Sequence, residues 1–198
     1  MKSHARVVVI GGGVVGVSTL YHLSKKGWSD VVLLERTELT AGSTWHAAGL
    51  LPLFNMSYTV GQLHKYSVDL YKRLPAETGQ DVSFHVTGNL RLATCRDRMD
   101  EYRKYCGTAN TIGVPFQLIS PAEVKELWPL VNLGGDADTP AVIGALYHPD
   151  DGHIAPADLT MALRRAARSA GAEINEQTEV TGAVQMPSGE WKLTTNRG

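Results

Sequence analysis

The sequence has little cysteine and almost no net charge, and each shortage narrows the classes of protein to consider. Two of its 198 residues are cysteines, and Cys95 and Cys106 form neither a CxxC pair nor a metal-ligand spacing. We therefore expect no metal site, and a reducing compartment is the simpler interpretation. The formal net charge is −1, so no strong electrostatic field indicates binding to nucleic acid or to an anionic membrane surface.

Long hydrophobic runs and low-complexity tracts are also missing. The most apolar stretch, VVVIGGGVVGV over residues 7–17, is interrupted by glycines and is too short to span a bilayer. MKSHAR leads directly into it without a small-residue cleavage site, so we expect no signal peptide. These absences favour a bacterial cytoplasm, with a processed form in the mitochondrial matrix as the alternative.

The composition is that of an ordinary globular protein. Hydrophobic residues make up 43% of the chain and charged residues 20%, which allows a sizeable core. The chain ends on WKLTTNRG, a predicted strand and turn, with nothing to close the unit begun upstream. We expect it to be the N-terminal part of a longer protein.

The first 35 residues predict a βαβ unit. Residues 5–10, ARVVVI, are uninterrupted and β-branched, as in a strand buried on both faces. A glycine-rich turn and a helix ending at Gly27 follow, and then a second buried strand over residues 31–35. The whole has the length of about 30 residues that a parallel-sheet crossover requires.

Downstream, the pattern predicts a mixed insertion and then a return to the sheet. A long helix is expected over residues 57–79, a hairpin turned at Gly88-Asn89 over 82–94, and a capping box at 120–123. A helix over 156–170 then leads to a third parallel strand at 173–175. The apolar face of the first helix is expected at Val60, Leu63, Ser67, Leu70 and Leu74.

The fold class that follows is α/β. We expect a doubly wound, parallel, Rossmann-like sheet with a mixed α+β insertion. Residues 1–79 and 150–198 would form the dinucleotide-binding domain, and residues 80–149 would begin a substrate domain.

The glycine-rich turn carries the first chemical signal, Gly11-x-Gly13-x-x-Gly16. In this context Gly11 permits the tight turn, Gly13 lets a pyrophosphate approach the backbone, and Gly16 lets helix and strand pack closely. Glu35 follows roughly 20 residues later, where an acid that binds a ribose belongs. The alternative is a glycine-rich turn with a solvated acid. The expected dinucleotide contacts here are Gly11, Gly13, Val14, Val15, Gly16, Glu35 and Arg36.

The second signal is the small-residue loop AGSTWHAAGLL, residues 41–51. Its first four residues offer hydroxyl and N–H groups to an extended ligand, and Ala47, Ala48 and Gly49 leave room for a flat ring. That combination favours a flavin over a nicotinamide. The expected contacts are Gly42, Ser43, Thr44, His46, Ala48, Gly49 and Leu50. Trp45 either packs beside the ring or merely anchors the loop.

With these motifs the chain resembles the FAD-dependent D-amino-acid-oxidase-like superfamily. The similarity is to the dimethylglycine dehydrogenase and sarcosine dehydrogenase family, through STWHAAGL and DDGHIAP, and it covers nearly the whole chain. The resemblance implies that FAD is bound covalently, through its 8α-methyl group, to His46. It also implies that the backbone at Val180 contacts the adenine, although Val180 can equally be an ordinary strand valine.

The resemblance also implies an activity, the oxidative demethylation of an N-methylated amino acid, most closely N,N-dimethylglycine. Oxygen or an electron-transfer flavoprotein would accept the electrons, and tetrahydrofolate would bind in a later part of the protein. Catalytic residues are expected beyond residue 198. The alternatives are a sarcosine dehydrogenase or another N-methyl amine oxidase, and a non-catalytic dinucleotide-binding module.

Four other residues have open or structural roles. His153 could handle substrate or protons, but its turn more simply shapes the entry to the next helix. Arg91 could bind a carboxylate, yet a lone strand arginine is more often a packing residue. His22 and His64 lie on predicted helices, and we interpret both as structural.

Overall fold

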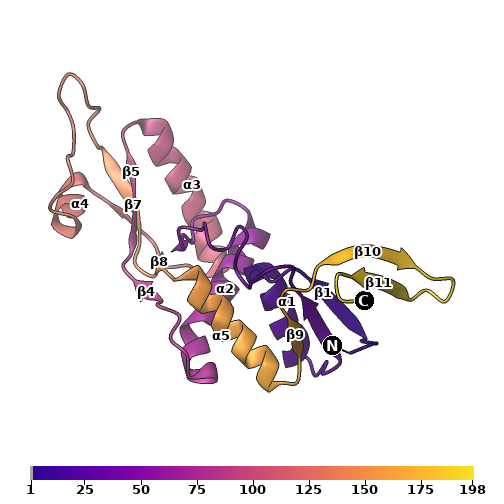
Figure 1. The fold of residues 1–198 in the computed structure, drawn as a ribbon. Coiled ribbons are helices and arrows are strands. Elements are labelled where there is room, and N and C mark those ends of the chain that lie inside the picture. The colour runs from indigo at the N-terminus through magenta and orange to yellow at the C-terminus, as the bar shows by residue number, and fades with distance from the viewer. Residues whose placement is uncertain (1) are drawn as a thin grey trace. The chain divides into compact units, whose positions relative to one another are not determined.

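A computed structural model describes residues 2–198, which form two compact units (Figure 1). The first comprises the chain up to Gly49 together with Arg73–Ser83 and Ala155–Gly198, and the second comprises Leu50–Lys72 and Phe84–Ile154. These limits differ from the predicted domain limits chiefly in residues 50–72, which belong to the second unit. None of the helices in the described part of the chain is both long and apolar enough to cross a membrane.

The first unit is built on a parallel sheet. Its strands are β1 (Val7–Ile10), β2 (Val31–Leu34) and β9 (Glu173–Asn175), in the order β1-β2-β9. The central strand β2 is buried along its whole length, as its uninterrupted apolar sequence predicts. The predicted βαβ unit and the third parallel strand are therefore confirmed.

Helices and a hairpin complete the first unit. Helix α1 (Val14–Lys25) packs against α5 (Pro156–Ser169), and β10 (Val180–Gln185) pairs with β11 (Trp191–Thr195) as an antiparallel ribbon (Figure 1). Helix α5 buries its apolar stripe because its leucines and alanines recur at helical spacing. The α/β fold class is thus confirmed, and β1, α1 and β2 supply the frame of the candidate site.

The second unit contains two small antiparallel sheets. One joins β3 (Leu50–Leu51), β8 (Gly152–His153) and β4 (His85–Val86), in that order. The other joins β5 (Asn89–Ala93), β7 (Gly144–His148) and β6 (Gln117–Ile119).

The predicted hairpin over residues 82–94 is wrong, because β4 pairs with β8 and β5 pairs with β7. Gly88 does turn the chain, with a positive φ of 72°. The N–H groups of Thr87 and Gly88, however, donate to the carbonyl oxygen of Asp151 at 3.2 and 2.9 Å. The turn is therefore bound by Asp151, a residue distant in sequence, and its two flanking strands belong to different sheets.

Three helices accompany the two sheets: α2 (Tyr58–Thr78), α3 (Arg96–Ile112) and α4 (Pro121–Leu127). The capping box at the start of α4 is confirmed. The predicted face of α2 is correct at Leu70 and Leu74 but wrong at Val60 and Leu63, which are 37% and 63% exposed. The helix meets its neighbours elsewhere in its first turns, where a Cβ on Gly61 would lie 2.3 Å from Ile112 Cδ1.

Candidate functional site

The turn between β1 and α1 requires glycine at two of the predicted positions. Gly11 has a φ of 107°, which favours glycine, and its N–H donates to the carbonyl oxygen of Leu34 at 2.8 Å. A Cβ on Gly16 would lie 2.0 Å from the Gly11 carbonyl oxygen. The close approach of helix and strand expected from the motif is therefore present.

Gly12 also belongs to this turn, at a position where the Gly-x-Gly-x-x-Gly motif specifies no residue type. It is buried, and a Cβ there would lie 2.5 Å from Leu39 Cδ2. Its N–H donates to Glu35 Oε2 at 2.6 Å, and its carbonyl oxygen accepts from the Thr40 N–H at 3.0 Å. Gly12 therefore joins the turn both to the predicted ribose acid and to the small-residue loop. In the sequence, the run of three glycines was the signal that could have identified Gly12 as part of the site.

The N-terminus of α1 is open to an anion. Gly13 is the N-cap, in extended conformation, and its neighbour Val14 donates its N–H to Thr44 Oγ1 at 2.9 Å. The first amides of a helix have no partner within it and carry the positive end of its dipole. With Val14 taken by Thr44, the amides of Val15 and Gly16 remain for a phosphate. Val15 is 77% exposed, so solvent and ligand can reach this turn.

Glu35, directly after β2, is held in one orientation. Its Oε1 accepts from the Thr37 N–H at 2.8 Å and from the Thr37 hydroxyl at 3.1 Å, while Oε2 accepts from Gly12. Partial burial raises the pKa of this carboxyl. The Thr37 and Gly12 amides and nearby Arg36 together lower the pKa by more than burial raises it, so the net shift is downward. An ionised carboxylate accepts hydrogen bonds only, which suits the hydroxyls of a ribose. Thr37 was not foreseen as part of the site.

Backbone bonds tie the start of the β10 ribbon to the same end of the sheet. The Glu35 N–H donates to the Asn175 carbonyl oxygen at 2.9 Å, and the Thr178 N–H donates to the Glu35 carbonyl oxygen at 2.7 Å. Val180 follows as the half-buried first residue of β10, opposite Thr195. Val180 therefore lies two residues after Thr178, which binds the backbone of Glu35 directly.

The small-residue loop is anchored at its start. Thr40, with a φ of 71°, contacts Gly12 and accepts from the Trp45 N–H at 3.1 Å, and Thr44 is buried against the glycine turn. Exposed positions in the rest of the loop include Gly42, Ser43, Trp45, His46 and Ala48. Leu50, predicted with this loop, instead begins the second unit in β3 and pairs with His153.

His46 is exposed, and its ring has a defined hydrogen bond. Nδ1 lies 3.2 Å from the Gly42 carbonyl oxygen. Because a carbonyl oxygen can only accept, Nδ1 carries the proton in this bond. In a neutral ring Nε2 then has a free lone pair, which is the form that a nucleophile or ligand needs.

Comparisons with known proteins agree with this geometry. Residues 6–198 match the family described as DAO: FAD dependent oxidoreductase. The chain is 45% identical to the mitochondrial dimethylglycine dehydrogenase of Rattus norvegicus, over 100% of this chain and 22% of that protein. It is 42% identical to the mitochondrial sarcosine dehydrogenase of Homo sapiens, over 92% of this chain and 19% of that protein.

A solved structure has the same fold. The L-proline dehydrogenase of P. horikoshii matches with a TM-score of 0.89 and 32% identity, over 100% of this chain and 50% of that one. The chain spans about a fifth of the length of the two curated relatives. The match of the family over almost every residue, joined to the glycine turn and the fixed acid, shows that the chain belongs to the FAD-dependent oxidoreductases of the DAO family.

Proposed function

We propose that this chain is the FAD-binding part of an enzyme that oxidatively demethylates an N-methylated amino acid, with N,N-dimethylglycine as the first candidate. The observation that carries the proposal is the 45% identity to a dimethylglycine dehydrogenase over the whole chain. The 42% identity to a sarcosine dehydrogenase makes sarcosine the second candidate substrate.

In this proposal the cofactor lies along the carboxyl end of the parallel sheet. Its pyrophosphate binds the amides of Val15 and Gly16, its ribose hydroxyls bind Glu35, and the backbone at Val180 contacts the adenine. The exposed N-terminus of α1 and the fixed carboxylate of Glu35 support this arrangement. Arg36, exposed beside the acid, adds positive charge near the phosphates.

The flavin end lies along the small-residue loop, with Gly42, Ser43, Thr44, Ala48 and Gly49 against it. We infer that His46 bonds to the 8α carbon of the flavin through Nε2, since Nδ1 is engaged with Gly42. Formation of the bond would release one proton from the 8α carbon and one from the imidazole, and the two electrons would reduce molecular oxygen to hydrogen peroxide. A covalent link also prevents loss of the cofactor.

FAD held by these residues would supply a hydride acceptor for oxidation of the N-methyl carbon of the substrate. The amine must be neutral, because an ammonium has no lone pair to support loss of hydride. Water would then hydrolyse the iminium product to formaldehyde and the demethylated amine with release of a proton, or the one-carbon unit would pass to tetrahydrofolate in a later part of the protein. Oxygen or an electron-transfer flavoprotein takes the electrons, and a bacterial cytoplasm stays our prediction for the location.

The proposal is tested on the full-length protein that carries this chain. The purified protein is denatured in acid, and the peptide containing His46 is examined by mass spectrometry for an attached flavin. His46→Ala should abolish the attachment, whereas His4→Ala, at another exposed histidine, should not. Anaerobic addition of dimethylglycine or sarcosine should then bleach the flavin absorbance.

Each outcome separates the candidates. Faster bleaching by sarcosine would make sarcosine the substrate. Flavin that is released in acid would leave a non-covalent site typical of the wider amine oxidases. A folded protein that binds no FAD would contradict the proposal and favour a non-catalytic module.

A further inference from the structure

Two histidines of the second unit lie directly opposite each other in one of its sheets. His85 of β4 pairs with His153 of the central strand β8, and on the other side of β8 the partner of His153 is Leu50. The two imidazole ring centres are 5.1 Å apart, and the ring planes are tilted by 42°. Both histidines are exposed. They therefore form a two-imidazole cluster at the surface of this unit.

The backbone holds β4 and β8 close together at this pair. A Cβ on Gly152 would lie 2.0 Å from the His85 carbonyl oxygen, so this approach of the two strands requires glycine. Beyond the pair, the Thr87 and Gly88 N–H groups donate to the Asp151 carbonyl oxygen at 3.2 and 2.9 Å. Residues directly opposite on antiparallel strands have Cβ atoms about 4.5–5.5 Å apart, so their side chains can reach one small ligand. The sheet therefore sets the separation of the two imidazoles.

Both rings keep their nitrogens for a ligand. Among the described residues, neither His85 nor His153 forms a hydrogen bond or an ion pair. A neutral imidazole has one nitrogen with a free lone pair, and imidazole suits zinc, copper and nickel ions. With Zn–N bonds of about 2.0–2.1 Å at a tetrahedral angle, the centres of two bound imidazoles would lie about 5.2 Å apart. The observed separation of 5.1 Å agrees with that geometry.

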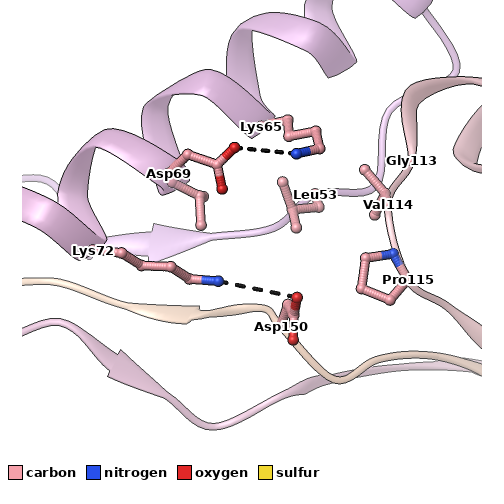
Figure 2. A pocket seen from close by; sticks show the side chains of 9 residues that line it. Leu53, Lys65, Asp69, Lys72, Gly113, Val114, Pro115 and Asp150 are labelled. Carbon is pink, nitrogen blue, oxygen red and sulfur yellow. Dashed lines mark hydrogen bonds and ion pairs between the residues drawn. The ribbon is translucent and has the colours of Figure 1, made fainter.

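The small pocket of the same unit offers no comparable set of ligands. Figure 2 shows that its charged side chains are already paired, Lys65 with Asp69 at 3.1 Å and Lys72 with Asp150 at 4.0 Å. Its volume of about 40 Å³ leaves room for only a few water molecules. Asp150 lies two residues before β8 and is half-exposed. It is therefore a nearby carboxylate that can be neutralised without removing an imidazole.

We propose that His85 and His153 together bind a divalent transition-metal ion of the class that includes Zn²⁺, Ni²⁺ and Cu²⁺. In the part of the chain that the structure describes, no group of three or more histidine, cysteine, aspartate or glutamate side chains is arranged to hold a metal ion. The ion therefore keeps open coordination positions, which water or an added ligand fills, and its binding is reversible. The cysteine pattern gave no signal for this site, because its ligands meet only through the pairing of β4 with β8.

The test measures the protection of single histidines in the full-length protein that carries this chain. The protein is treated briefly with diethyl pyrocarbonate, which modifies free imidazole nitrogens, at increasing concentrations of zinc sulfate. Peptide mass spectrometry then gives the modification rate of each histidine. Zn²⁺ should slow the modification of His85 and His153 by about fivefold or more, with one shared midpoint. The exposed His4 is the control, and its rate should change less than about twofold.

Coupling between the two histidines is the deciding readout. In His85→Ala, protection of His153 should require about tenfold more Zn²⁺, because one of two linked ligands is lost. In His153→Ala, the same should hold for protection of His85. Asp150→Asn should leave the protection of both histidines unchanged, since it removes a charge but no imidazole. Loss of protection in that variant would count against the imidazole pair.

Protection that persists unchanged in a variant lacking the partner histidine would show adventitious binding to single histidines and overturn the proposal. An absence of protection would overturn it as well. So would a pair that the reagent fails to modify even without Zn²⁺, because the proposed site must be open to solvent. Both side chains are exposed, so the alanine variants should fold; if one does not, His85→Gln or His153→Gln takes its place. The readout does not involve the flavin, so a failure here leaves the proposed function standing.

Discussion

Asp151 and His148 are buried in the same core and should respond to pH in opposite directions. Burial raises the pKa of Asp151 from 3.8 to about 6, although the Leu53 amide and the charge of Arg91 lower it in part. Burial, followed by the charge of Arg91, lowers the pKa of His148 from 6.5 to about 4. His148 is fully buried, and neither ring nitrogen has a hydrogen-bond partner among the described residues.

The sign of each effect follows from proton binding in the folded and unfolded states. Between pH 4 and 6 the folded state holds a proton on Asp151 more tightly, so the free energy of unfolding falls as pH rises. Between pH 4 and 6.5 the unfolded state holds a proton on His148 more tightly, so the free energy of unfolding rises with pH. Each shift is equivalent to about 3 kcal/mol. In the wild type the two contributions should nearly cancel.

Single substitutions should separate the two opposed pH dependences of the free energy of unfolding. Asp151→Asn removes the contribution that falls with pH, so its free energy of unfolding should rise, relative to the wild type, by about 2 kcal/mol from pH 4 to pH 6.5. His148→Gln removes the contribution that rises with pH, so the change relative to the wild type should have the opposite sign. Asp150→Asn should give a much smaller difference, because its carboxylate is half-exposed and its charge is only the last of the causes that act on the pKa of Asp151.

The assay is a series of urea titrations between pH 4 and 7, read out by hydrogen exchange in peptides of α3. A local readout is needed because a protein with two compact units is not assured of two-state unfolding. Subtraction of the wild-type curve removes the titration of surface groups that all variants share. A difference curve for Asp151→Asn that stays flat within about 0.5 kcal/mol would refute the raised pKa of Asp151, and a flat difference curve for His148→Gln would refute the lowered pKa of His148.

Three further substitutions test the geometry of the site and fold. Gly16→Ala places a Cβ 2.0 Å from the Gly11 carbonyl oxygen, so it should cost about 1–3 kcal/mol of stability and reduce FAD retention, measured by thermal unfolding and flavin absorbance. Thr44→Val removes the acceptor for the Val14 N–H and should lower the urea midpoint by the equivalent of about 1 kcal/mol; an unchanged midpoint would contradict a role for this bond. Ser120→Ala removes the capping box and should cost about 1 kcal/mol without changing FAD retention.

The βαβ unit was predictable because its determinants are local. The uninterrupted apolar run of β2 indicates burial on both faces, and the spacing of Gly11, Gly13 and Gly16 specifies a turn into a helix. Glu35 ends the same unit, so its place at the carboxyl end of the sheet follows from the same short window. The third parallel strand at 173–175 is farther along the chain, but a helix preceding it gave the required crossover.

The second unit was less predictable because its turns depend on distant partners. Gly88 and Asn89 look like a hairpin turn within any short window, yet the carbonyl oxygen that orders this turn belongs to Asp151. Helix α2 was misjudged for a related reason, since its first turns meet a residue distant in sequence at a glycine: a Cβ on Gly61 would lie 2.3 Å from Ile112 Cδ1. A search for apolar side chains at helical spacing cannot find a contact face that contains a glycine.

At the candidate site, too, part of the geometry could not be predicted from the sequence, down to the roles of single atoms. The family resemblance implies His46 as the nucleophile, but it does not say which ring nitrogen is available. That choice depends on the Gly42 carbonyl oxygen, which lies 3.2 Å from Nδ1. Gly12 and Thr37 were missed because both act chiefly through backbone N–H groups, which every residue but proline possesses. A sequence can therefore name the side chains of such a site, whereas its backbone donors and its tautomers require the fold.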